Sequence, residues 1–203
     1  MKKYTGIQKL SDNKFLNLFH LDALTDSGHP FDYFFVSRRK ADQIKLLTKD
    51  SAAEGVVIFP VLKEDPEKVV LIRQYRYPLD DVLYELPAGL IDAGETPECA
   101  AIREMKEETG LSFEVYTGGD AAYRRPFYMG AGFTDESCNA VFGYASGTVS
   151  RRDQEDTESI QVLIAGKEEV RRILREEKVS IRAAYLLMSF VHMADNDPFG
   201  FLK

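Results

Sequence analysis

The stretch Gly89-Leu-Ile-Asp-Ala-Gly-Glu95, followed by Arg103-Glu-Met-Lys-Glu-Glu-Thr-Gly-Leu111, is the most informative part of this 203-residue sequence. It places glutamates at positions 95, 104, 107 and 108 around a single arginine. Carboxylates at this density near one helix face repel each other unless cations lie among them. The stretch therefore predicts a divalent metal site, and metal ions held by carboxylates point to phosphate chemistry.

The second half of this stretch is predicted to be a helix with clear ends. Thr96 is the expected N-cap, Pro97 suits the first helical position, and Gly110 suits the C-terminal stop. Within this helix Glu104, Glu107 and Glu108 are three or four residues apart, so they project from one side. The alternative is a solvated acidic helix face with ordinary ion pairs.

The apolar residues of the same helix suggest how it packs. Ala100 and Ala101 are expected on the acidic side, where small side chains leave room for ions and a substrate. Ile102 and Met105 are expected on the opposite side, as the anchor to the core. Arg103 can reach both Glu95 and Glu107, which favours a role in holding carboxylates in place.

Composition limits the classes of function. The net charge of -7 argues against general nucleic-acid binding, which needs a basic face. We expect no membrane span, and the polar N-terminal residues do not resemble a secretion signal. Cys99 and Cys138 have no metal-like spacing, and two lone thiols fit a reducing cytoplasm.

The chain is predicted to have two parts, an N-terminal β layer over residues 1–50 and an α/β domain over residues 51–203. Strands and helices mix without strict alternation, which favours a mixed sheet between helices. The last helix is apolar nearly all round, so we expect it to be buried between layers. The expected strands are 14–24, 31–39, 55–62, 68–76, 83–88, 114–118, 122–125, 139–146 and 159–165, and the other helices are 167–177 and 181–193.

The complete pattern from Gly89 to Leu111 resembles the Nudix box, without a substitution. The resemblance implies a Nudix fold, an α/β/α sandwich, and hydrolysis of a nucleoside diphosphate linked to another group. It further implies that Glu104, Glu107, Glu108 and the carbonyl group of Ala88 are metal ligands. Glu107 and Glu108 would thereby be catalytic, Glu95 and Arg103 would support them, and the metal would be Mg²⁺ or Mn²⁺.

The residues before the box resemble the ADP-ribose pyrophosphatase branch of this family. These are Gln74-Tyr-Arg-Tyr-Pro78 and Tyr84-Glu-Leu-Pro-Ala-Gly89. The resemblance implies that Arg76 contacts the diphosphate and that Glu85 contacts the nucleoside side of the substrate. The alternative is a strand-end arginine and a strand glutamate with local partners.

The resemblance also implies a homodimer formed through the N-terminal β layer. In that branch, aromatic and basic residues of this layer complete the partner's pocket. Phe34 is a candidate for stacking on a base and Arg38 for reaching a phosphate. The alternative for both residues is packing in the core or in the dimer interface.

Two features of the later loops bear on substrate and mechanism. Members of this branch carry a proline about fifteen residues after the box, and by count this is Pro126. The local context instead matches Gly130-Ala-Gly132, with Ala131 in place of the proline, and context is the better guide because loop lengths vary. In the resemblance, the general base comes from an acidic loop, for which Glu155 and Glu158 are the candidates.

The resemblance implies a Mg²⁺-dependent hydrolase that cleaves ADP-ribose to AMP and ribose 5-phosphate. The alternatives are hydrolysis of another nucleotide sugar, such as GDP-mannose or ADP-glucose, and a ligand-sensing domain without turnover. Isoprenoid diphosphate isomerisation would require a catalytic cysteine, but Cys99 is expected to point away from the acidic face.

Overall fold

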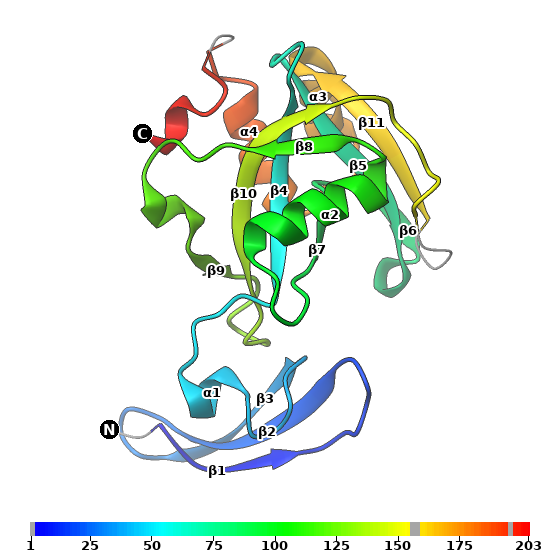
Figure 1. Cartoon of the computed structure of the whole chain (residues 1–203). Helices are drawn as coiled ribbons and strands as arrows, with labels where there is room; N and C mark the ends of the chain where they lie inside the picture. The colour runs from blue at the N-terminus through cyan, green and yellow to red at the C-terminus, as the bar shows by residue number, and fades with distance from the viewer. Residues whose placement is uncertain (1–2, 155–158, 195–196) are drawn as a thin grey trace. The chain divides into compact units, whose positions relative to one another are not determined.

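We describe the protein from a computed structural model, in which residues 3–154, 159–194 and 197–203 are described. The chain forms two compact units (Figure 1). Unit 1 comprises residues 1–54 and 126–138, and unit 2 comprises residues 55–125 and 139–203. A segment that follows the box by some fifteen residues therefore belongs to the same unit as the N-terminus, which the sequence does not predict.

Unit 1 contains a three-stranded antiparallel sheet in the order β1-β2-β3. Residues on one face of β2 are buried in alternation, and Phe19 stacks on Phe35 of β3 with a ring distance of 5.3 Å. The segment from unit 1's second part joins this sheet through a parallel bridge between Val36 and Thr134. The elements are β1 (Tyr4–Lys9), β2 (Asn17–Leu24), β3 (Pro30–Ser37), α1 (Lys45–Thr48) and β9 (Pro126–Tyr128).

Unit 2 is built on a mixed sheet whose main path is β11-β5-β4-β10-β8, with β6 paired to β5 and β7 paired to β4. Strand β10 begins in unit 1 and runs into this sheet. The strands are β4 (Gly55–Leu62), β5 (Lys68–Arg76), β6 (Asp81–Glu85), β7 (Ala88–Leu90), β8 (Ser112–Val115), β10 (Ser137–Ser146) and β11 (Ile160–Gly166). The helices are α2 (Pro97–Thr109), α3 (Lys167–Glu176) and α4 (Ile181–Phe190), with short 3-10 turns at Tyr77–Leu79, Ala121–Arg124 and Gly200–Leu202.

Helices cover both faces of this sheet, which confirms the predicted α/β/α sandwich (Figure 1). The central strand β4 is buried along nearly its whole length, as expected for a strand covered on both sides. Ile58 belongs to the core cluster that contains Met105 of α2. On the other face, Phe59 packs against Phe190 of α4 with a ring distance of 6.2 Å.

The structure corrects several expectations. The predicted strand 122–125 is a 3-10 turn, because the carboxylate of Asp120 caps it at Ala122 N with a distance of 2.8 Å. The predicted strand 83–88 is two strands, β6 and β7, because each pairs with a different neighbour. Strand β1 and helix α1 were not predicted, since both are short and lack a strong apolar period.

Two helices are packed differently from the expectation. In α2 both alanines are fully buried in the core while Ile102 is 45% exposed, so Ala100 and Ala101 do not leave room for a ligand. Helix α4 is not buried all round, because Ile181, Tyr185 and Met188 are exposed on one face. None of the helices in the described ranges is long and apolar enough to cross a membrane.

Candidate functional site

The loop and helix of the box have the predicted ends. Thr96 Oγ1 accepts a hydrogen bond from Cys99 N at 3.3 Å, with Pro97 in the first helical position. At the other end Gly110 has a φ angle of +77°, the left-handed conformation that glycine adopts without strain. These ends fix the register of α2, and thereby the positions of its three predicted ligands.

Arg103 is the hub of the box carboxylates. Its guanidinium donates two hydrogen bonds to Glu95, from Nε to Oε1 at 3.1 Å and from Nη2 to Oε2 at 2.9 Å. Its Nη1 also donates to Glu104 at 2.8 Å and to Glu107 at 2.9 Å. A further bond from Nη2 to the carbonyl oxygen of Leu90, at 2.8 Å, attaches the arginine to the loop. This geometry is what a residue that positions the carboxylates requires.

These contacts shift the charge equilibria at the box. The hydrogen bond from Arg103 is the main cause that lowers the pKa of Glu95 below its ordinary value. The pKa of Arg103 is raised, first by its hydrogen bond with Glu95 and further by Glu104 and Glu107. Both groups are therefore charged at neutral pH, so their ion pair connects the loop with the helix under these conditions.

Two close contacts bring the strand before the box against the helix. Glu108 is only 2% exposed, and its Oε2 accepts a hydrogen bond from Ala88 N at 3.2 Å. A Cβ atom at Gly89 would lie 1.9 Å from the carboxyl carbon of Glu104, so a larger residue there would displace this carboxylate. The backbone at Ala88 and Gly89 therefore lies directly beside two of the predicted metal ligands.

The donor set fits a divalent metal. Glu95, Glu104, Glu107 and Glu108 carry four negative charges against the one positive charge of Arg103. All the candidate donors are carboxylate or carbonyl oxygens, which Mg²⁺ and Mn²⁺ prefer.

A second cluster of possible ligand groups, His20, Asp22 and Asp32, lies in unit 1, with ligand atoms within 4.8 Å of one another.

Beside the box, a buried glutamate holds arginines from two elements. Glu85 at the end of β6 is 4% exposed and accepts a hydrogen bond from Arg76 Nε at 2.6 Å. Its other carboxylate oxygen lies 3.6 Å from Nη2 of Arg182, in the first turn of α4. The structure thus brings together the predicted residues Arg76 and Glu85. Sequence reasoning missed Arg182, because no motif connects it with them.

The other predicted site residues are in different places. Phe34 and Arg38 belong to unit 1, where Phe34 stacks on His20 at a ring distance of 5.0 Å. Arg38 Nε lies 3.4 Å from a carboxylate oxygen of Glu136. The candidate general bases Glu155 and Glu158 lie outside the described residues.

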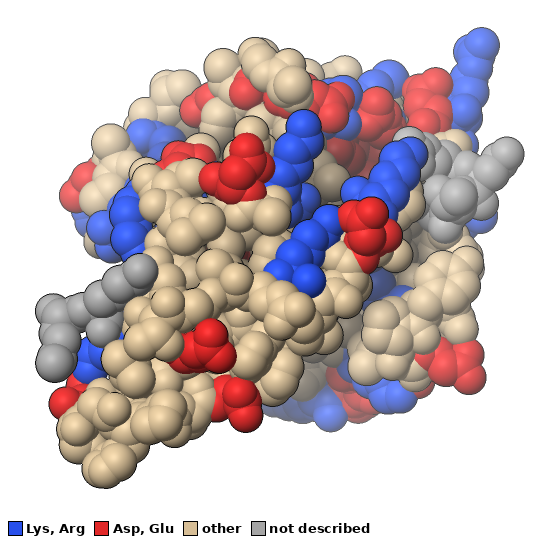
Figure 2. Space-filling model, turned by 90° about the horizontal axis from the view of Figure 1, so that it is seen from below, with Lys and Arg blue, Asp and Glu red and all other residues tan. Residues whose placement is uncertain are grey.

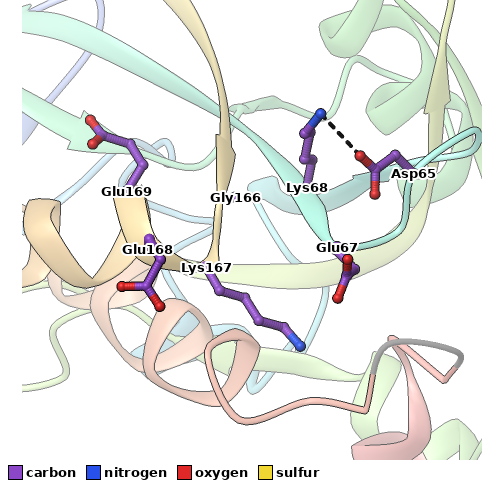
Figure 3. Close-up of a pocket in the computed structure, with 7 residues that line it drawn as sticks. All are labelled: Asp65, Glu67, Lys68, Gly166, Lys167, Glu168 and Glu169. Atoms are coloured by element: carbon purple, nitrogen blue, oxygen red, sulfur yellow. Dashed lines mark ion pairs between the residues drawn. The ribbon is translucent and has the colours of Figure 1, made fainter.

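Unit 2 also has an open cavity of about 300 Å³ beside the β4–β5 turn and the start of α3 (Figure 3). Its lining contains none of the predicted site residues, and its lysines are engaged. Lys68 forms an ion pair with Asp65 at 3.0 Å, and Lys167 Nζ donates to the carbonyl oxygen of Met193 at 2.8 Å. The lining residues are Asp65, Glu67, Lys68, Gly166, Lys167, Glu168 and Glu169.

Comparisons with known proteins agree with this fold. The crystal structure of an ADP compounds hydrolase matches 93% of this chain and 94% of its own, with a TM-score of 0.67 and 19% identity, and this likeness shows a common fold. The family model of the NUDIX domain matches residues 52–184. The chain therefore belongs to the NUDIX domain family.

Two curated relatives illustrate the similarity within this family. The chain is 39% identical over 122 residues to Putative nudix hydrolase 2 of Caenorhabditis elegans, which covers 57% of this chain and 52% of the relative. It is 31% identical over 159 residues to the ADP-ribose pyrophosphatase of Mycobacterium tuberculosis, covering 72% and 71% of the two chains. The chain spans 37% to 65% of the length of four matches, that of C. elegans included.

Proposed function

We propose that this protein hydrolyses the diphosphate bond of a nucleoside diphosphate sugar, with ADP-ribose as the preferred substrate and AMP and ribose 5-phosphate as products. The observation that carries the proposal is that Arg103 forms hydrogen bonds with three box carboxylates, beside the buried Glu108. Similarity to the ADP-ribose pyrophosphatase of M. tuberculosis supports the choice of substrate.

The box residues would hold the metal. Glu104, Glu107, Glu108 and the carbonyl group of Ala88 are the proposed ligands, and Mg²⁺, or alternatively Mn²⁺, is the proposed metal. When bound, the metal would polarise the diphosphate and lower the pKa of an attacking water. Arg103 and Glu95 keep the ligands in register, since they connect the loop with the helix.

The remaining residues would bind the substrate and move the proton. Arg76 is proposed to bind the diphosphate and Glu85 the nucleoside side. Glu155 or Glu158 is the proposed general base, which takes one proton from the water as its oxygen bonds to phosphorus and the bridging P–O bond breaks. The bridging oxygen leaves with the other phosphate, so each product carries one phosphate.

A second nucleotide sugar, such as GDP-mannose or ADP-glucose, is the alternative substrate. It is favoured by Ala131, which stands where the ADP-ribose branch typically has proline. This residue lies in a turn in which Phe133 N donates to the carbonyl oxygen of Gly130 at 2.9 Å.

We further propose a homodimer formed by an N-terminal β layer, residues 1–50, attached to a catalytic domain over residues 51–203. Unit 1 exposes several large apolar side chains, including Phe15 at 65% and Phe34 at 52%. Most of the surface seen in Figure 2 is uncharged, with acidic and basic side chains scattered over it. Cys99 and Cys138 are not joined by a disulfide, which suits the proposed cytoplasmic location.

The proposed activity is tested with Glu108→Gln, which removes one proposed ligand charge with little change in volume. We expect kcat for ADP-ribose with Mg²⁺ to fall about 1,000-fold, since loss of a metal ligand costs several kcal/mol of transition-state stabilisation. Nucleotide release is measured for ADP-ribose, ADP-glucose, GDP-mannose and NADH.

The matched control is Glu98→Gln, which removes an exposed carboxylate from the first turn of the same helix. Its turnover should equal that of the wild type. Near-normal turnover by Glu108→Gln would refute the metal assignment. A wild-type protein that cleaves none of the four substrates would favour ligand sensing instead.

A further inference from the structure

The cluster of Glu85, Arg76 and Arg182 has a net positive charge, because its two arginines face a single carboxylate. Glu85 is buried, and each of its carboxylate oxygens faces a different arginine, at 2.6 Å from Arg76 and 3.6 Å from Arg182. Two guanidinium groups against one carboxylate leave a net charge of +1. Their side chains are 38% and 31% exposed, so this excess charge is open to a ligand.

Backbone pairing fixes Arg182 beside Glu85. Tyr84 N donates to the carbonyl oxygen of Lys178 at 2.8 Å, and Ser180 N donates to that of Tyr84 at 3.1 Å. Together with the parallel bridge between Tyr84 and Val179, these bonds attach the residues before α4 to the end of β6. Arg182 follows two residues after Ser180, the N-cap of α4, so the sheet sets the backbone position of Arg182.

The hydrogen-bond donors of Arg182 are not satisfied by the described part of the chain. Its contact there is the ion pair with Glu85, and 3.6 Å is too long for a hydrogen bond. Arg172 of the neighbouring helix α3 shows the contrast, since it donates to both oxygens of Glu169 at 3.0 and 2.7 Å and to Glu177 at 2.8 Å. Arg182, whose side chain is 31% exposed, makes no such bonds within the described residues and therefore has donors available for an acceptor-rich ligand.

We propose that Arg182 binds a phosphate oxygen of the nucleoside diphosphate substrate together with Arg76, and that Glu85, in addition to its proposed contact with the nucleoside side, positions both arginines. The inference rests on the proposed function, whose substrate class it makes more specific. Glu85 and Ala88 are three residues apart, so the arginines' anchor lies within about 10 Å of the box backbone. A diphosphate could thus meet the arginines at one end and the box at the other. The start of α4 adds a partial positive charge of the same sign.

The test compares Arg182→Ala and Arg182→Lys with the wild type. We expect Arg182→Ala to raise KM for ADP-ribose about tenfold with kcat within about threefold, because a binding contact of similar strength in ground and transition states is lost. Arg182→Lys keeps the charge and should return KM to within about threefold of the wild type. The matched control is Arg175→Ala, an exposed arginine of α3, which should leave both constants unchanged.

Competitive inhibition by AMP and by adenosine separates a phosphate contact from a contact with the base or with the fold. In Arg182→Ala the inhibition constant of AMP should rise about tenfold while that of adenosine stays the same. Equal rises for both compounds, or an unchanged KM together with an unchanged AMP constant, would overturn the inference.

Calorimetric binding of AMP keeps this inference separate from the proposed reaction. A wild-type protein that binds AMP but cleaves no substrate would refute the proposed function alone. The inference then stands if Arg182→Ala binds AMP about tenfold more weakly, and fails if the two affinities are equal. It also fails if the wild type binds neither AMP nor ADP.

Discussion

Two regions of the molecule combine a glutamate of low side-chain exposure with two basic side chains, and they differ in how exposed those basic side chains are. In unit 1, Glu54 accepts hydrogen bonds from Lys45 Nζ at 2.8 Å and from Arg39 Nε at 2.5 Å. The side chains of this lysine and arginine are only 7% and 16% exposed. In unit 2, Glu85 faces Arg76 and Arg182, whose side chains are 38% and 31% exposed.

The difference separates a structural network from the proposed binding site. The basic groups around Glu54 have further internal partners, since Lys45 also contacts Ser137 Oγ and Arg39 also bonds to Asp50 at 2.6 Å. Such a network is satisfied from within, and breaking it leaves charges buried. The arginines around Glu85 instead keep donors and surface for a ligand. The two roles are therefore distinguished by how far the basic side chains are buried and hydrogen-bonded within the protein, more than by which residue types are present.

The box is a third cluster of charged residues, in which acidic side chains outnumber basic ones. There one arginine, Arg103, holds three carboxylates, and its side chain is 30% exposed while that of Glu107 is 43% exposed. The excess charge is negative and partly open, like the positive excess around Glu85. Within unit 2, the two open clusters thus suit the two partners of the proposed reaction, a metal cation and a phosphate anion.

The largest effect on stability is expected from Lys45→Met in the closed network. After the substitution Glu54 keeps only Arg39 of its two basic partners. The loss of this charge pair should lower the free energy of unfolding by about 3 kcal/mol. Urea denaturation measures this loss, with Lys40→Met, the removal of an exposed lysine in the same unit, as control. A loss of unfolding free energy below about 1 kcal/mol would show that Glu54 does not depend on these internal partners.

A smaller loss of stability is expected from Glu85→Gln in the open cluster. Its arginines reach solvent, so removing the carboxylate should cost only about 1–2 kcal/mol. The same variant should raise KM for ADP-ribose, because both arginines lose the group that positions them. If Glu85→Gln is as destabilising as Lys45→Met and leaves KM unchanged, the two clusters do not differ in role.

The smallest expected effect is a difference in pH dependence between Glu54→Gln and the wild type. Burial by itself would raise the pKa of Glu54, but hydrogen bonds from Lys45, Ser137 and Arg39 outweigh it, so the pKa is lowered. A lowered pKa contributes stability above the ordinary glutamate value of about 4.5, and this stability is lost as the pH falls through the lowered value. Below pH 4.5 the wild type should therefore lose unfolding free energy more steeply than Glu54→Gln, as measured by urea denaturation.

Much of the fold was predictable because its signals are local. Strands β4 and β5 and helix α2 match their predicted ranges, since continuous apolar runs and helix caps act over a few residues. The exposed face of α4 was predicted wrongly. Its apolar residues at 181, 185 and 188 cannot be distinguished from core residues by composition, because only the position of the sheet determines which face is covered.

The sequence by itself determined the box: the helix, its caps and the side from which Glu104, Glu107 and Glu108 project. The reason is that spacings of three and four residues translate directly into one helix face. Only the tertiary structure decided that Arg182 stands beside Glu85, almost a hundred residues earlier in the chain. That neighbourhood depends on the pairing of Val179 with Tyr84, a long-range backbone contact that no local pattern encodes.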